Sequence, residues 1–223
     1  AARIILLQRG PRVLPGFAQG LSRAATKALS RLGVEVHTGV DVESVDEKGA
    51  SAAGQRFDAH TVIWAAGVMA SPAGRWLDTA RDRQGRIEVN KDLSVANLGN
   101  VFAIGDTASA TGADGHQLPG IAPVAKRQGI YAARVIRARI AGTKEPAPFL
   151  YRHISRMATV GRSSAVVDLG YLRLTGCPGW LVWSAAHVFF LIGFRNKFAV
   201  SLNWLWAYLT YESGMRLITG SRK

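Results

Sequence analysis

A glycine and an aspartate directly after an apolar run are the first residues here that could do chemistry. Val101–Ile104 has the pattern of a short strand buried on both faces, and Gly105 and Asp106 follow it. Glycine allows a ligand to approach the backbone, and a carboxylate at a strand end can accept hydrogen bonds from sugar or ribitol hydroxyls. Because a lone Gly-Asp pair is more often only a turn, Asp106 is a candidate that its neighbours must support.

The segment that follows predicts a helix over Ala122–Ile140. Pro123 suits its first turn, and Arg134, Arg137 and Arg139 suit its solvated, C-terminal part. A helix N-terminus supplies free N–H groups and partial positive charge. The start of this helix therefore suits an anionic ring, such as the pyrimidine ring of a reduced flavin.

The first third of the chain alternates strand and helix patterns. We predict a strand at Arg3–Leu7, a helix at Leu21–Leu32 ended by Gly33, a strand at Val34–Thr38, a hairpin of Val40–Asp46 with Ala50–Phe57, and a strand at Thr61–Ala65. This order is typical of the later half of a dinucleotide-binding domain, so we expect the α/β class.

Gln8 and Arg9 occupy the end of the first of these strands. In dinucleotide-binding domains an acidic side chain there accepts hydrogen bonds from the adenosine ribose. A neutral amide beside a guanidinium would not repel a 2′-phosphate, so the pair predicts tolerance of NADPH. A plain surface Gln-Arg pair is an equally good interpretation.

The sequence gives little support for metal or thiol chemistry. Cys177 is the single cysteine, which excludes an internal disulfide and a Cys-x-x-Cys redox pair. His116 lies in a glycine-rich loop with no second ligand at metal spacing, so we expect a surface residue and no metal site. We expect His187 to be packed inside a helical core.

The C-terminal third combines positive charge with tryptophan. The formal charge is +13, and residues 146–223 contain nine Lys or Arg against two acids and four of the six tryptophans. We predict helices over Trp180–Phe194 and Phe198–Ile218, separated by a break at Arg195–Lys197. Each apolar run is too short to cross a bilayer alone. We expect this pair to lie in an anionic membrane surface through Trp180, Trp183, Trp204 and Trp206; a core or dimer interface is the alternative.

Three ordered motifs resemble the type II (alternative, non-proton-pumping) NADH:quinone oxidoreductases. They are Val62–Val68, Asn100–Asp106 and Leu118–Gly129, and the resemblance extends to Met157–Arg162 and the aromatic C-terminal part. It implies a peripheral membrane flavoenzyme in which NADH, with NADPH as the alternative donor, reduces FAD, which in turn reduces a quinone. The implied location is the cytoplasmic face of a bacterial inner membrane or a face of the mitochondrial inner membrane.

The resemblance also assigns site residues. Gly105 and Asp106 would contact the ribitol–pyrophosphate part of FAD, and Ala122, Pro123, Val124 and Ala125 would face its ring. Ala66 and Gly67 would lie beside the nicotinamide nucleotide, with Gln8 and Arg9 at its adenosine end. The family's quinone-side Ala-Gln-x-Ala-x-Gln motif has Pro123 and Arg127 in place of its glutamines, which leaves Lys126, Arg127 and Gln128 as the quinone-side candidates. No catalytic residue is assigned.

The fold implied is an incomplete two-dinucleotide-binding-domain flavoprotein fold with a C-terminal amphipathic helical membrane-binding region. We expect residues 1–68 to be the later half of the NAD(P)H-binding domain, 69–145 the C-terminal part of the FAD-binding domain, and 146–223 the membrane-association region. No Gly-x-Gly-x-x-Gly is present, although the family has two such fingerprints. We therefore expect a C-terminal fragment that is inactive alone.

Other interpretations stay open at this point. A sulfide:quinone-type enzyme shares the implied fold but uses cysteine pairs beside the flavin. A non-catalytic membrane-surface module would need only the basic, aromatic C-terminal part, and it could form a homodimer. A nucleic-acid binder is indicated by charge alone, so we expect no nucleic-acid partner.

Overall fold

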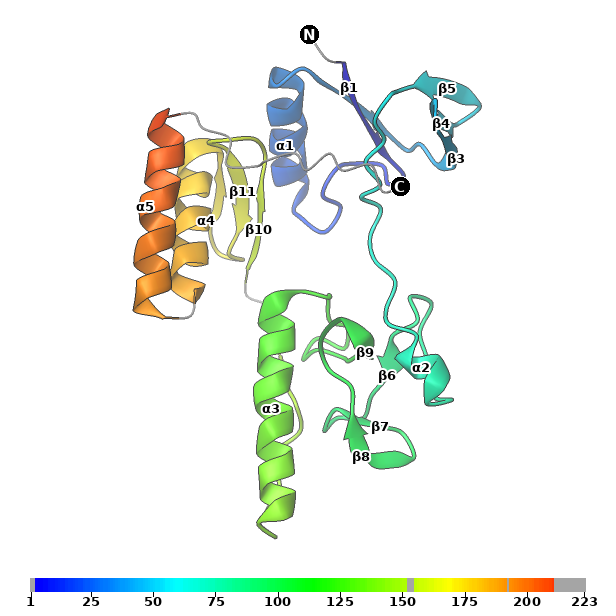
Figure 1. Ribbon diagram of the computed structural model, residues 1–223, viewed down its shortest axis with the longest axis vertical. Coiled ribbons are helices and arrows are strands. Elements are labelled where there is room, and N and C mark those ends of the chain that lie inside the picture. Colours follow the sequence, from blue (N-terminus) through cyan, green and yellow to red (C-terminus); the bar gives the residue numbers. More distant parts are fainter. Residues whose placement is uncertain (1–2, 152–154, 192, 211–223) are drawn as a thin grey trace, which may run out of the picture. The chain divides into compact units, whose positions relative to one another are not determined.

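The computed structural model describes residues 3–151, 155–191 and 193–210. The chain divides into two compact units. One comprises Ala1–Val62 with Ile154–Lys223, and the other comprises Ile63–His153. Figure 1 labels most elements of both units.

The N-terminal part of the first unit is a strand–helix–strand motif. β1 (Ile4–Gln8) and β2 (Val34–Thr38) pair in parallel, and α1 (Gln19–Arg31) connects them. Gly33 follows α1 with a φ of +81°, a backbone conformation that glycine adopts without strain. The predicted strand–helix–strand order is confirmed here.

A three-stranded antiparallel meander follows, formed by β3 (Val42–Asp46), β4 (Gly49–Ala52) and β5 (Gln55–Asp58). The prediction of a single strand over Ala50–Phe57 is therefore wrong. The chain reverses at Ala53 and Gly54, whose φ angles are +50° and +71°. This left-handed turn splits the predicted strand in two.

The C-terminal part of the same unit packs against α1. β10 (Arg156–Thr159), β11 (Ala165–Asp168) and β12 (Arg173–Thr175) form an antiparallel sheet. Leu21 and Ala25 of α1 share a buried cluster with Val160 and Val166. The helices α4 (Gly176–Phe190) and α5 (Phe194–Thr210) follow, and they lie side by side in Figure 1.

The predicted break between these helices is misplaced. The chain leaves α4 at Leu191, which is extended, and Gly193 has a φ of +83°. Arg195 and Lys197 therefore lie inside the first turn of α5 and do not interrupt it. The rest of the predicted second helix, residues 211–218, lies outside the described residues. None of the helices in the described part of the chain is long and apolar enough to cross a membrane.

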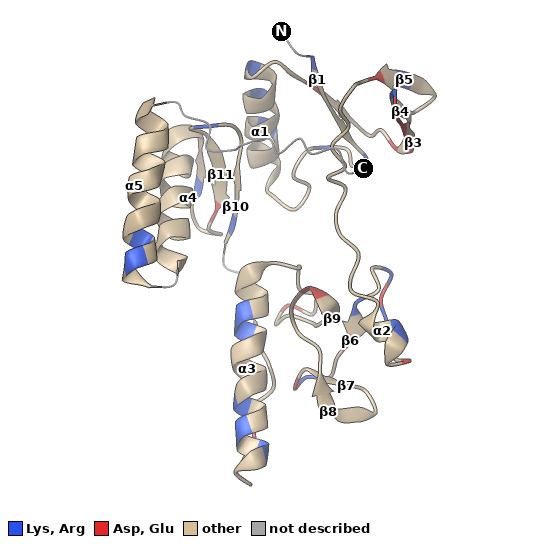
Figure 2. Ribbon diagram, in the orientation of Figure 1, with Lys and Arg blue, Asp and Glu red and all other residues tan. Residues whose placement is uncertain are grey.

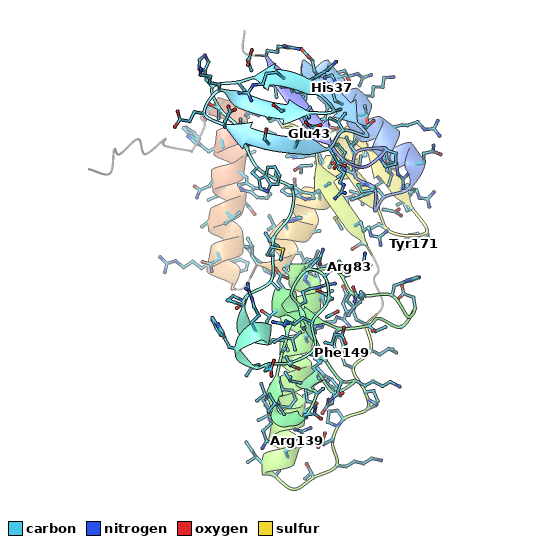
Figure 3. All side chains as sticks on the ribbon, turned by 90° about the vertical axis from the view of Figure 1, so that its right-hand side faces the viewer. His37, Glu43, Arg83, Arg139, Phe149 and Tyr171 are labelled. Atoms are coloured by element: carbon cyan, nitrogen blue, oxygen red, sulfur yellow. The ribbon has the colours of Figure 1, made fainter. Side chains whose placement is uncertain are left out.

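The second unit holds small strand pairs and one long helix. α2 (Ala73–Trp76) precedes β6 (Ile87–Glu88), β7 (Ser94–Val95), β8 (Leu98–Phe102), the 3₁₀ turn η1 (Gly105–Thr107), β9 (Ala108–Ser109) and α3 (Ala122–Ile140). β6 pairs with β9 in parallel, and β7 pairs with β8 antiparallel. Tyr131 on α3 contacts Phe149, which Figure 3 labels, with ring centroids 5.4 Å apart. The predicted bounds of α3 are confirmed.

Two strand predictions fail. Thr61–Ala65 is not a strand, and its side chains Ile63 and Trp64 are 84% and 65% exposed. A strand needs a hydrogen-bonded neighbour, and the described residues supply none to this segment. β8 ends at Phe102, two residues before Ile104, whose side chain is exposed. Val101 and Phe102 are only half-buried, so the predicted burial on both faces is wrong.

Candidate functional site

The turn at Gly105 and Asp106 is the central feature of the second unit. Ile104 is extended and Gly105 has a φ of +65°. A Cβ on Gly105 would lie 3.3 Å from the Cβ of Ala125, so the turn approaches the first turns of α3. The carboxylate of Asp106 is exposed and makes no hydrogen bond or ion pair with any described residue. A Cβ on Gly120 would lie 2.9 Å from its Oδ1, so Gly120 leaves room for this carboxylate.

Gln128 holds this turn from α3. Its side chain is 1% exposed, and its Oε1 accepts a hydrogen bond from the backbone N–H of Gly105 at 2.6 Å. A buried amide of this kind must be hydrogen-bonded to be tolerated. The structure therefore gives Gln128 a positioning role that its place in the quinone-side motif did not reveal. Its predicted contact with a quinone stays a prediction.

The start of α3 offers fewer donors than the sequence predicts. The N–H groups of Val124 and Ala125 both donate to the carbonyl of Ile121, at 3.0 and 3.1 Å. Pro123 has no N–H, and no described residue accepts from the N–H of Ala122. The four predicted residues therefore leave one free donor, together with the positive end of the helix dipole.

Lys126 and Arg127 are exposed on the same helix turn. The guanidinium carbon of Arg127 lies 5.9 Å from the ring centroid of Tyr151, which is buried. Figure 2 shows that these two cations begin a series of basic residues along α3. In sequence, both residues lie between Ala125 and Gln128, which approach Gly105 from α3.

A buried ion pair stabilises the loop before α3. The sequence patterns did not predict this pair. Arg86 Nε lies 2.7 Å from Asp82 Oδ2, and both side chains are about a tenth exposed. The other nitrogens of Arg86 donate to the carbonyl of Leu118 at 3.0 Å and to Oε1 of Gln117 at 2.9 Å. Burial alone would raise the pKa of Asp82, but hydrogen bonds from Arg86 and from the N–H of Gln84 outweigh it. The pKa of this carboxyl therefore lies below its usual value.

The predicted nucleotide residues of the first unit lie at the carboxyl edge of the β1–β2 pair. The N–H groups of Gly39 and Val40 donate to the carbonyls of Gly10 and Gln8, so the loops after both strands are joined. Arg9 Nε lies 2.8 Å from Asp41 Oδ1 in an exposed ion pair. Asp41 escaped prediction because it belongs to the loop after β2, distant in sequence.

The other two predicted nucleotide residues, Ala66 and Gly67, belong to the second unit. They lie in the exposed extended segment that fails to form a strand, and Gly67 has a φ of +103°. Their nucleotide role stays a prediction. His116 is exposed in its loop, as predicted. No group of three His, Cys, Asp or Glu side chains among the described residues could hold a metal ion.

The predicted membrane tryptophans divide into two sets. Trp183 stacks on Trp204 at 5.7 Å, and Trp180 contacts Tyr208 at 4.6 Å, so these rings lie between α4 and α5. They line a cavity of about 260 Å³. Trp206 faces outward. His187 is exposed and rests on Trp183, so its predicted place in a packed core is wrong.

The outward face of α5 carries an apolar stripe. Its members are exposed and recur at intervals of three and four residues: Phe194, Phe198, Leu202, Leu205, Trp206 and Leu209. This spacing places them on one face of the helix. Figure 2 shows α4 and α5 free of charged side chains except at the start of α5. The helical spacing was visible in the sequence, but only the packing shows which face α4 leaves uncovered.

Comparison with known proteins decides the family. The profile of the pyridine nucleotide-disulphide oxidoreductases matches residues 1–129. The chain belongs to this family. The β1–β2 pair and the Gly105–Asp106 turn fall inside the matched residues.

Relatives in this family confirm the predicted resemblance. The chain is 38% identical to the type II NADH:quinone oxidoreductase Ndh of Mycobacterium tuberculosis, over 98% of this chain and 48% of the relative. It is 32% identical to the mitochondrial internal alternative NAD(P)H-ubiquinone oxidoreductase A1 of Arabidopsis thaliana, over 88% of this chain and 42% of the relative. The chain thus spans about half the length of the curated relatives that it matches.

A solved structure shows the same fold. The structure of NDH2 from Plasmodium falciparum in complex with NADH matches with a TM-score of 0.80 at 15% identity, over 96% of this chain and 59% of that one. The predicted α/β flavoprotein-type fold is confirmed at this level.

Proposed function

We propose that this chain forms part of an FAD-dependent NADH:quinone oxidoreductase of type II. The observation that carries the proposal is the Gly105–Asp106 turn, which Gln128 holds against the N-terminus of α3 in a member of the pyridine nucleotide-disulphide oxidoreductase family. The relatives named type II NADH:quinone oxidoreductase support the choice of donor and acceptor.

The residues at this turn fit FAD. Among the described residues, the carboxylate of Asp106 and the N–H of Ala122 have no partner, and Gly105 and Gly120 leave room beside the carboxylate. A carboxylate accepts hydrogen bonds from hydroxyls, and the helix N-terminus favours negative charge. When bound, FAD supplies two-electron redox chemistry that the side chains lack. Residues 69–145 would then belong to its binding domain.

The nicotinamide nucleotide would use the first unit and the adjoining segment. Gln8 and Arg9 lie where the adenosine ribose of a dinucleotide binds in such folds, and residues 1–68 would form the later half of its domain. Ala66 and Gly67 would approach the nicotinamide end. NADH is the proposed donor, with NADPH as the alternative.

The quinone would arrive from a membrane. Lys126, Arg127 and Gln128 are the proposed quinone-side residues, and Gln128 also holds the turn at Gly105. The α5 stripe gives residues 146–223 an apolar face, and Arg195 and Lys197 at its start suit anionic headgroups. The protein would be peripheral, on the cytoplasmic face of a bacterial inner membrane or on a mitochondrial inner-membrane face. A homodimer through the same stripe is the competing arrangement.

A hybrid polypeptide tests the flavin site. In it, this chain replaces the matched 48% of the mycobacterial relative. We expect Asp106→Ala to lower the flavin content of the purified hybrid at least tenfold, because ribitol hydroxyls lose a charged acceptor. Asp114→Ala, an exposed aspartate in the following loop, is the matched control. Equal flavin content in both variants would remove Asp106 from the site.

A further inference from the structure

An ion pair at the carboxyl edge of β1 and β2 has a consequence for nucleotide choice. Arg9 follows β1 and Asp41 follows β2, and their side chains meet at 2.8 Å. The two strands are parallel, so both loops emerge at the edge where ligands of open α/β sheets bind. Backbone hydrogen bonds from Gly39 and Val40 tie the loops together, which keeps the pair at this edge.

We propose that Asp41 determines the nucleotide preference by occupying Arg9, and that it disfavours nucleotides with a 2′-phosphate. This inference rests on the proposed function, because it assumes that the β1–β2 edge receives the adenosine ribose. The strand-end acid that would normally repel a 2′-phosphate is Gln8 here. Asp41 restores a carboxylate to the same edge from the neighbouring loop.

Arg9 is the cation at this edge that a 2′-phosphate would meet. Arg12, the next cation along the loop, turns its Nη2 onto the carbonyl of Pro15 at 2.7 Å. Gln8 carries no charge, and a Cβ on Gly10 would lie 3.1 Å from its Nε2, so its amide is close to the loop backbone. A 2′-phosphate would therefore reach Arg9 in competition with Asp41, and it would meet the negative charge of that carboxylate.

The chain contains a matched control. Arg3 and Glu35 form an ion pair of the same kind at the opposite edge of the same two strands, with Arg3 Nε 2.7 Å from Glu35 Oε1. Both pairs are exposed. Glu35→Gln therefore makes the same change in net charge and breaks the same kind of contact, but away from the carboxyl edge.

The experiment measures the binding of adenosine 5′-monophosphate and adenosine 2′,5′-bisphosphate to the chain by NMR titration. We expect Asp41→Asn to tighten binding of the bisphosphate about three- to fivefold relative to the monophosphate, the scale of an exposed ion pair. The gain should shrink at high salt and vanish in the double variant Arg9→Gln/Asp41→Asn. Glu35→Gln should leave the ratio of the two affinities unchanged.

Three results would overturn the proposal. They are an unchanged ratio in Asp41→Asn, an equal change in Glu35→Gln, and binding of neither nucleotide by the wild-type chain. Neither probe involves flavin or quinone. A hybrid that fails to reduce quinone would thus count against the proposed function alone, and an unchanged nucleotide ratio would count against Asp41 alone.

Discussion

The side-chain Oε1 of Gln128 lies 2.6 Å from the backbone nitrogen of Gly105. This hydrogen bond joins the middle of α3 to a left-handed turn 23 residues earlier, and it is shielded from water by the burial of Gln128. The same turn holds the exposed carboxylate of Asp106. The proposed flavin site therefore depends on the buried amide of Gln128.

Replacing Gln128 tests this dependence. Gln128→Leu keeps the volume but leaves the N–H of Gly105 without its acceptor, which should lower the free energy of unfolding by about 1–3 kcal/mol. Urea unfolding followed by circular dichroism measures the change. Lys126→Ala, on the exposed face of the same helix, should change stability by about 0.5 kcal/mol or less. Equal losses in both variants would mean that the hydrogen bond contributes nothing.

The space around Gly105 gives a second prediction. Gly105→Ala and Gly115→Ala both place a side chain at positive φ, which costs about 1–2 kcal/mol. Gly115 faces open space, whereas a Cβ on Gly105 meets Ala125 at 3.3 Å. The Gly105 variant should therefore be the less stable of the two by about 1 kcal/mol in urea unfolding. A Gly115 variant at least as unstable would contradict the close approach of turn and helix.

The ion pair of Asp82 with Arg86 predicts how the free energy of unfolding changes at acid pH. The folded pKa of Asp82 lies below its unfolded value of about 3.9. Its stabilising effect is thus complete above the unfolded pKa and is lost as pH falls through the folded pKa. Asp82→Asn should flatten the pH dependence of the free energy of unfolding below about pH 4.

The same pair predicts a cost at neutral pH. Asp82→Asn should destabilise the chain by about 3 kcal/mol, because Arg86 keeps its buried charge without its partner. Urea unfolding at pH 7 and over an acid series measures both effects. A variant with the wild-type acid slope would show that Asp82 does not hold a lowered pKa.

The α5 stripe predicts vesicle binding. Leu202→Asp should weaken cosedimentation with anionic phospholipid vesicles at least tenfold, since a charge on the stripe opposes burial among acyl chains. Asn203→Asp, exposed on another face of α5, makes the same change in net charge and should bind nearly as the wild type. A Leu202→Asp chain that binds vesicles fully but loses self-association in sedimentation would assign the stripe to a dimer.

Local sequence patterns predicted the helices, whose backbone hydrogen bonds lie within the element itself. The apolar spacing, Pro123 and Gly33 sufficed for α1 and α3, since helices close their own hydrogen bonds. Thr61–Ala65 has a strand composition but no strand, because a strand is defined by a neighbour.

The candidate site could be predicted only where its residues are close to one another in the sequence. The Gly105–Asp106 turn and the start of α3 were visible as motifs. Asp41 and the contacts of Arg86 with Gln117 and Leu118 were not, because each contact joins two loops that are distant in sequence. The hydrogen bond of Gln128 to Gly105 was not predictable either, because the sequence pointed to Gln128 only as a neighbour of the quinone-side motif.

One absorbance measurement tests the central claim most directly. The purified hybrid polypeptide, checked for folding by circular dichroism, receives NADH and then a short-chain quinone without oxygen. The account predicts that its flavin bands bleach with NADH and return with quinone. A folded hybrid whose flavin stays oxidised with NADH, or stays bleached after quinone, would contradict the proposal that this chain belongs to an NADH:quinone oxidoreductase.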